Sequence, residues 1–146
     1  MKSNINFFTE DIHYAIKQKN LARKWINDRI LSEGFSPGEI NIIFCSDDYL
    51  HKINVEYLNH DNFTDIITFD YTENQKISGD LFISIERVKE NAKFFTRKIS
   101  EELHRVIIHG VLHLCGYGDK SKKEQEIMTK KENINLSHRP VKLRDS

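Results

Sequence analysis

The sequence predicts an α+β fold in which helices pack on a small mixed β-sheet. Short stretches of β-branched and aromatic residues, typical of strands, alternate with longer segments whose apolar residues recur every three or four positions, typical of amphipathic helices. These segments follow no regular β-α-β rhythm, which disfavours a doubly wound parallel sheet. A chain of 146 residues has the length of one domain, so we expect residues 1–146 to form a single domain with one core.

The first third of the chain contains one helix between two strands. Residues 5–8 form a short apolar stretch that we expect to be a strand. Over residues 19–33, apolar side chains at helical spacing predict an amphipathic helix, which Gly34 ends. A turn at 36–38 leads to a second strand over residues 39–45, rich in isoleucine and phenylalanine.

The middle of the chain adds a helix, two strands and a further helix. Ser46 is a suitable N-cap for a helix that runs to about Leu58. Strands are expected over residues 65–69 and 81–85, with a polar, turn-like segment between them. Residues 86–95 then favour a helix.

The last third is dominated by a helix that is apolar around most of its circumference. It follows Ser100, its predicted N-cap, and its apolarity indicates a central and buried helix. Ser121 and Glu124 have the spacing of a capping box, which opens a last helix to about Asn133. The polar and basic tail from Ser137 is expected to be loose.

The composition excludes several classes of protein. Lysine plus arginine and aspartate plus glutamate both number 22, so the zero net charge excludes a generally polybasic nucleic-acid binder but not a local basic patch. No apolar stretch approaches the roughly 20 residues of a membrane-spanning helix. The only two cysteines, Cys45 and Cys115, provide no disulfide framework. We therefore expect a cytoplasmic protein that has no membrane segment and works as a monomer.

The strongest chemical signal is a pair of histidines on the apolar helix. His109 and His113 lie four residues apart, so their side chains share one helix face and can bind one metal ion. Gly116 ends the helix, and a reversal there can bring Asp119 back beside the two imidazoles. Core histidines with satisfied hydrogen bonds are the plainer interpretation, but the glycine and the carboxylate at this spacing favour a metal site.

The spacing of these ligands is that of the elongated zincin motif, so we expect a zincin-like arrangement with a central metal-binding helix. Gly110 replaces the general-base glutamate of that motif, which argues against a metalloprotease. A glycine inside a helix costs about 1 kcal/mol relative to alanine, so Gly110 indicates either open space above a metal or tight helix packing. Cys115 lies about 200° around the helix from His113 and is expected to face away from the metal.

Residues 109–117 read HGVLHLCGY, which resembles the signature His-Gly-x-Leu-His-Leu-x-Gly-Tyr-Asp-His of the YbeY family of rRNA-maturation endoribonucleases. Further matches to that family are INVEY (53–57, for Leu-Asn-x-x-Tyr-Arg), TDIITF (64–69, for Thr-Asp-Val-Leu-Ser-Phe), GDL (79–81, for Gly-Asp-Ile) and Met128. The resemblance covers about residues 38–132. This chain has Asp119 in place of the family's third histidine ligand and Leu58 in place of its arginine.

The resemblance implies a metal-dependent, single-strand-specific endoribonuclease that acts in maturation of the 16S rRNA 3′ end and in ribosome quality control. Its partners would then be rRNA and the ribosomal subunit. It also implies one zinc ion on His109, His113 and Asp119, with metal-activated water attacking the phosphodiester. A carboxylate ligand in place of an imidazole tilts the preference towards harder ions such as Mn²⁺ or Fe²⁺.

No general base stands out in the sequence. Asp65, Asp70 and Asp80 are candidates, each in a predicted strand or at its end. Asp80 draws most attention, because Gly79 beside it permits close approach of the backbone to a ligand. A cap, a turn or a hydrogen bond to a ligand histidine is the plainer role for each of the three.

RNA binding would require local positive charge, because the net charge is zero. For these contacts we select Arg87, Arg105 and Lys120. His60, Arg87 and Arg105 are candidates to replace the family's arginine at Leu58.

Other functions share parts of this pattern. A metalloprotease or other metallohydrolase shares the ligand spacing, and a ferrous oxygenase shares the set of two histidines and one carboxylate, although its ligands normally come from strands. A non-catalytic, metal-stabilised ribosome-binding module fits the loss of arginine at Leu58. Assays on single-stranded RNA, with and without a chelator, separate these functions.

Overall fold

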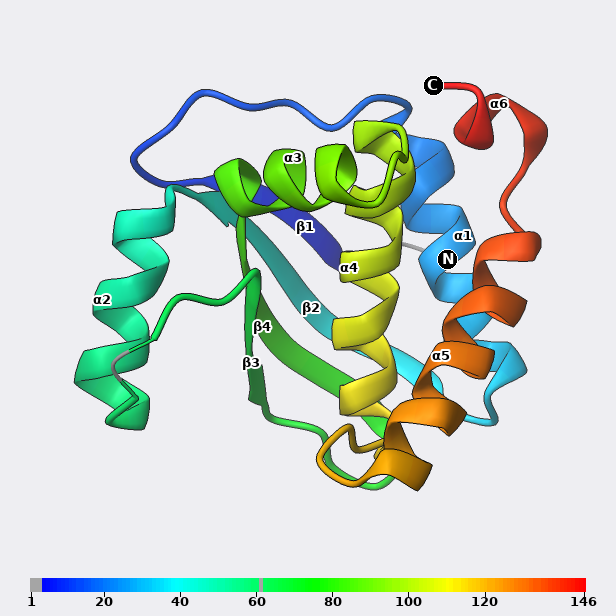
Figure 1. The fold of residues 1–146 in the computed structure, drawn as a ribbon. Coiled ribbons are helices and arrows are strands. Elements are labelled where there is room, and N and C mark those ends of the chain that lie inside the picture. Colours follow the sequence, from blue (N-terminus) through cyan, green and yellow to red (C-terminus); the bar gives the residue numbers. More distant parts are fainter. Residues whose placement is uncertain (1–3, 61) are drawn as a thin grey trace.

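The computed structural model describes residues 4–60 and 62–146 (Figure 1). The elements in chain order are β1 (Ile5–Thr9), α1 (Lys19–Ser32), β2 (Ser36–Cys45), α2 (Asp47–Leu58), β3 (Ile66–Asp70), β4 (Lys76–Ser84), α3 (Ile85–Phe94), α4 (Ile99–Leu114), α5 (Lys122–Ser137) and α6 (Val141–Arg144). Helices and a small sheet are therefore mixed along the chain, as the sequence predicted.

The four strands form one mixed sheet in the order β1-β2-β4-β3. β1, β2 and β4 run parallel, with Ile5 opposite Ile40 and Ile42 opposite Leu81. β3 runs antiparallel to β4 and forms an edge of the sheet, with Thr68 opposite Leu81. The prediction of a small mixed sheet is confirmed.

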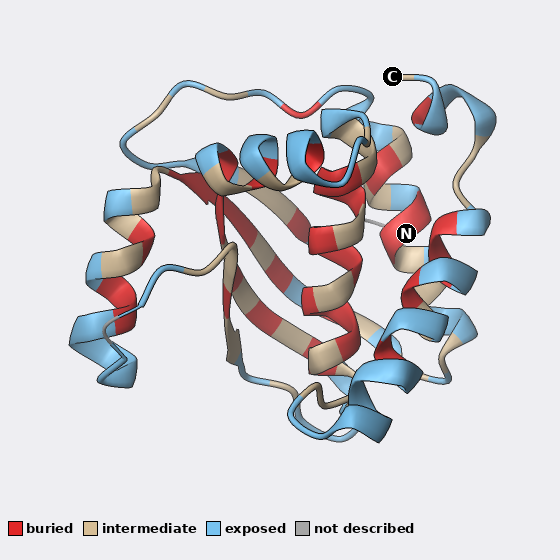
Figure 2. Ribbon diagram, in the orientation of Figure 1, coloured by how far each residue is buried: buried red, intermediate tan, exposed pale blue. Residues whose placement is uncertain are grey.

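Helices cover both faces of the sheet (Figure 1). α2 packs on one face, over a small cluster that includes Cys45, Leu50 and Ile67. α4 and α1 pack on the other face, α5 lies against the outer side of α4, and α3 crosses one end of α4. Figure 2 shows that α4 is buried along most of its length. α4 is thus the central helix that the sequence predicted, and it fixes the positions of the side chains along its partly exposed face.

Two of the predicted helix starts are confirmed in detail. The Ser46 hydroxyl accepts a hydrogen bond from the Tyr49 N–H at 3.1 Å and so caps α2. Ser121 caps α5 and forms the complete capping box with Glu124. In contrast, α4 begins two residues earlier than predicted, because Lys98 and not Ser100 occupies its N-cap position, with no side-chain cap bond.

Three predictions about local structure are wrong. The turn expected at 36–38 belongs to β2, which begins at Ser36 and pairs there with β4. The segment after β3 was expected to be only turn-like, but β4 begins at Lys76, and the reversal uses Asn74 and Gln75 with positive φ angles of 51° and 64°. Because neither position is a glycine, the sequence carries a weak turn signal. The tail from Ser137 is ordered and not loose, because α6 packs the side chain of Leu143 into the main core.

Within residues 4–60 and 62–146, no helix combines the length and the apolar character that crossing a membrane requires.

Candidate metal centre

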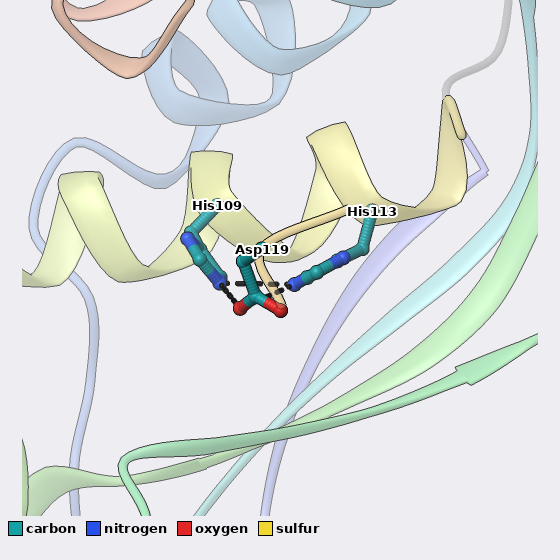
Figure 3. A group of neighbouring side chains, drawn as sticks. All are labelled: His109, His113 and Asp119. Atoms are coloured by element: carbon teal, nitrogen blue, oxygen red, sulfur yellow. Dashed lines mark hydrogen bonds and ion pairs between the residues drawn. The ribbon is translucent and has the colours of Figure 1, made fainter. Parts of the chain in front are cut away.

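Three side chains converge at the end of α4 (Figure 3). The Nε2 atoms of His109 and His113 lie 3.0 Å apart, and Oδ2 of Asp119 lies 3.2 Å from each of them. Ligand atoms around a tetrahedral cation with bonds of about 2.0–2.1 Å are about 3.3 Å apart. The donor set and its spacing therefore fit one divalent first-row cation, and we call these three residues the triad.

The turn after α4 brings Asp119 to the two histidines. α4 ends at Leu114 with Cys115 as its C-cap, and Gly116 adopts a positive φ of 99°, which reverses the chain. The Tyr117 hydroxyl donates a hydrogen bond of 2.8 Å to Oε1 of Glu33 and anchors the turn to the end of α1. The sequence predicted this reversal from Gly116 but not its anchor.

A buried glutamate from α5 orients the first histidine of the triad. Oε2 of Glu132 lies 2.6 Å from Nδ1 of His109, and Oε1 of Glu132 accepts a hydrogen bond of 3.0 Å from Arg105. Burial alone lowers the pKa of His109, but the hydrogen bond and charge of Glu132, together with the charges of Asp119 and Asp65, more than offset it, so this pKa lies above its usual value. Because Nδ1 is bound to Glu132, Nε2 is the nitrogen that faces the other two residues of the triad.

The sequence interpretation missed Glu132. The available signal was its position on the last helix, four residues after Met128 and four before Leu136, both of which are buried. An acidic side chain on a buried stripe needs a polar partner, and here that partner is a histidine of the triad.

Two cavities meet at the triad. One, of about 610 Å³, is lined by Leu58, His60, His113 and Lys120, among others. The other, of about 420 Å³, is lined by Phe95, Arg97, Arg105 and Glu132, among others. Four residues line both of them: Asp65, Ile66, His109 and Asp119. We call the two cavities together the groove.

The three candidate aspartates have different surroundings. Asp65 lines both cavities, and burial raises its pKa although the charge of His109 opposes the rise. Asp70 lines the larger cavity only. The structure does not bring Asp80 to the groove, because Leu81 next to it packs against α4 and successive strand residues point to opposite faces. Asp80 instead accepts a hydrogen bond of 3.0 Å from Asn41.

The three selected basic residues are also separated by the fold. Lys120 lines the larger cavity, and Arg105 lines the smaller one, where it pairs with Glu132. Arg87 lines neither cavity and pairs with Asp47 at 2.7 Å.

Of the three candidates to replace the family's arginine, only His60 lines the same cavity as Leu58. Arg105 lies in the other cavity, and Arg87 lies in neither.

Gly110 and Gly79, which the sequence associated with a ligand, are glycines because a side chain would clash with neighbouring atoms of the fold. A Cβ on Gly110 would lie 2.7 Å from Cδ1 of Ile66 and 3.1 Å from both δ-methyls of Leu81. Tight packing, and not open space, therefore explains Gly110. A Cβ on Gly79 would lie 2.5 Å from the Phe69 carbonyl oxygen, so the close approach there is to a neighbouring strand.

Cys115 packs against the main core and does not belong to the triad. Burial raises the pKa of its thiol to about 12, which disfavours the thiolate that binds metals. The expectation that Cys115 is not a ligand therefore agrees with its surroundings.

Comparison with known proteins gives concordant matches. A family model described as Endoribonuclease YbeY matches residues 4–139. The Endoribonuclease YbeY of Flavobacterium johnsoniae is 53% identical to this chain, and the match covers 92% of this chain and 94% of the relative. The Endoribonuclease YbeY of Christiangramia forsetii is 51% identical, and the match covers 93% of this chain and 94% of the relative. The solution structure of a Thermotoga maritima protein is 26% identical, with a TM-score of 0.65 over 91% of this chain and 87% of that one.

Proposed function

Because the chain belongs to the Endoribonuclease YbeY family, we propose that its groove binds single-stranded RNA and that the triad holds the metal ion needed for cleavage. The protein is an endoribonuclease of rRNA processing, and RNA is its substrate. The observation that carries the metal assignment is the convergence of two Nε2 atoms and one carboxylate oxygen within 3.0–3.2 Å of one another. Maturation of the 16S rRNA 3′ end and ribosome quality control are the roles we propose for it.

We propose zinc as the ion, with Mn²⁺ or Fe²⁺ as the alternatives that the Asp119 carboxylate favours. A divalent ion bound there would supply Lewis acidity towards a phosphoryl oxygen and would activate water. Glu132 would keep His109 oriented for binding by holding its Nδ1 atom. Residues 1–146 would work as one domain, as a monomer and in the cytoplasm.

We assign Asp65 the handling of a proton during cleavage. It lines both cavities beside His109, and burial raises the pKa of its carboxyl group above the usual value. A carboxyl group with a raised pKa can accept and return a proton closer to neutral pH than an exposed one. Asp80, on the other face of the sheet, has no access to this role.

Lys120 is the cation that we propose for phosphate contact in the larger cavity, and Arg105 has that role in the smaller one. Arg105 is also tied to Glu132, so its replacement would disturb the support of His109 as well. Lys120 is the cleaner test of an RNA contact. His60 is a further candidate, because it lines the cavity next to Leu58.

The deciding experiment measures cleavage of a single-stranded RNA by the purified protein, with metal content determined on the same sample. Cleavage should stop when a chelator removes the metal and should return when the metal is restored. His113→Ala should lose both metal and cleavage, whereas His138→Ala, at an exposed position after α5, should keep both. A fully metallated protein that binds RNA without cleaving it would instead support the non-catalytic ribosome-binding module.

A further inference from the structure

The smaller cavity of the groove carries an exposed aromatic ring. Phe95 and Arg97, from the junction between α3 and α4, line this cavity together with His109 and Asp119 of the triad. Phe95 is 52% exposed as a residue, and its ring makes an edge-to-face contact with the ring of Phe94, with 5.0 Å between the centroids. An RNA strand that crossed the triad would pass this ring.

The junction holds Phe95 in place despite its exposure. Its N–H donates to the carbonyl of Asn91 at 2.9 Å, and the Arg97 N–H donates to the carbonyl of Ala92 at 2.8 Å. Thr96 between them has a positive φ of 55°, which makes the turn tight. The ring is therefore presented by a fixed turn and not by a free loop.

Arg97 is positioned against the same ring. Its guanidinium carbon lies 4.8 Å from the centroid of the Phe95 ring. Its Nη1 donates a hydrogen bond of 2.8 Å to the carboxylate of Glu102, which is buried. This ion pair holds the guanidinium group beside the ring, so Phe95 and Arg97 form a preorganised pair at the groove.

We propose that Phe95 and Arg97 form a base-stacking subsite for one unpaired nucleotide of the RNA. This nucleotide would lie next to the phosphodiester bond that is cleaved at the triad. Any base can stack on an aromatic ring or a guanidinium plane, so such a subsite binds without a strong sequence preference. Bases inside a duplex are already stacked and paired, so the subsite also favours single strands. The inference rests on the proposed function, because it assumes that the groove binds RNA.

The test compares Phe95→Ala with Phe8→Ala in cleavage of a short single-stranded RNA. Phe8 is a matched control, because it is 50% exposed but lies on β1, outside the groove. Loss of one base stack should raise KM at least about fivefold in Phe95→Ala, with kcat and metal content within twofold of the wild type. Phe95→Tyr, which keeps an aromatic ring, and the control Phe8→Ala should both have the wild-type KM.

RNA with one abasic nucleotide identifies the stacked base. At one position the missing base should weaken binding to the wild type but not to Phe95→Ala. A KM for Phe95→Ala within twofold of the wild-type value, with no such position, would overturn the subsite. If the wild type cleaves no RNA, the proposed function fails, and the subsite is tested by RNA binding, measured as fluorescence anisotropy of labelled RNA. The subsite is supported if Phe95→Ala binds this RNA at least about fivefold more weakly than the wild type does. A smaller difference overturns it.

Discussion

The hydrogen bond between Glu132 and His109 shows how a residue outside the triad can decide what the triad does. Imidazole has two nitrogens, and the partner of one decides which is left for a metal. Glu132 holds Nδ1 at 2.6 Å and is itself held by Arg105 at 3.0 Å. The orientation of His109 is therefore set by two residues that need not contact the metal.

Replacing Glu132 by glutamine should weaken metal binding about 10- to 100-fold, because a neutral amide is a poorer partner for the Nδ1–H group than a carboxylate. The dissociation constant is measured by titrating the metal-free protein with Zn²⁺. Glu126→Gln, at an exposed position of the same helix, is the control and should bind as the wild type does. Equal affinity of Glu132→Gln and the wild type would show that Glu132 has no positioning role.

The roles of Asp65 and Asp80 can be separated by identical substitutions. Asp65→Asn should lower kcat about 100-fold or more while metal content is retained, because the amide cannot transfer a proton. Asp80→Asn should leave kcat within about twofold, because Asp80 lies outside the groove and an amide oxygen can still accept the hydrogen bond from Asn41. Single-turnover cleavage with metal analysis measures both, and the reverse order of effects would contradict the assignment of Asp65.

His104 should make stability depend on pH. Burial, assisted by the charge of Arg139, lowers its pKa in the folded protein to about 4. The unfolded chain has a pKa of about 6.5 at this position and so binds the proton more readily between these values. The free energy of unfolding should be unaffected by this group above pH 6.5 and should fall by about 3 kcal/mol as the pH drops towards 4.

Urea unfolding at pH 7.0 and at pH 4.5 measures this effect. His104→Gln should lose much less stability between the two pH values than the wild type does, because glutamine does not titrate. His138→Gln removes one exposed histidine and should keep the wild-type dependence. If His104→Gln and the wild type lose equal stability, another group is responsible.

At the scale of elements, the sequence predicted most helices and strands, because apolar spacing and capping residues act locally. The capping serines before α2 and α5 form the predicted bonds. The errors occur where distant contacts decide the structure. β4 extends back to Lys76 because its first residues pair with β2, with Lys76 opposite Ser36. α6 is ordered because Leu143 reaches the core. Neither contact leaves a periodic signal within the segment itself.

Gly110 is a further case in which distant contacts decide. The sequence left open space and tight packing as explanations for this glycine, and the packing of α4 on the sheet selects tight packing. In open space, Gly110→Ala would stabilise the helix by about 1 kcal/mol. Against Ile66 and Leu81, the added methyl should instead lower the free energy of unfolding, by about 1 kcal/mol, since overpacking outweighs the helical gain. The sign of the change in urea unfolding decides between the explanations.

Adding Ile66→Val to Gly110→Ala is the control for this prediction. Valine lacks the Cδ1 atom that would lie 2.7 Å from the new methyl. The loss in the double variant should therefore be smaller than the sum of the two single losses. Strict additivity, or a gain from Gly110→Ala alone, would mean that the packing is not tight.

At the scale of the whole molecule, segments far apart in the sequence meet to support the triad. Glu33, at the end of α1, accepts hydrogen bonds from Tyr117 at 2.8 Å, and from Lys131 and Asn135 at 3.2 Å each. Burial opposes ionisation of Glu33, but these bonds hold its pKa below the usual value. The sequence predicted the triad because helical spacing and a glycine turn are local. It could not predict Glu33 or Glu132, whose partners depend on the folded topology.

Since the triad joins α4 to the loop before α5, metal binding should stabilise the whole fold. A ligand that binds only the folded state at 100 times its dissociation constant adds about 2.7 kcal/mol. For a chain of 146 residues this corresponds to a rise in melting temperature of roughly 5–10 °C. Thermal unfolding of the chelator-treated protein, with and without added Zn²⁺, measures the rise. His113→Ala should show almost none, and His138→Ala should show the wild-type rise. An equal rise in both variants would place the bound metal elsewhere on the molecule.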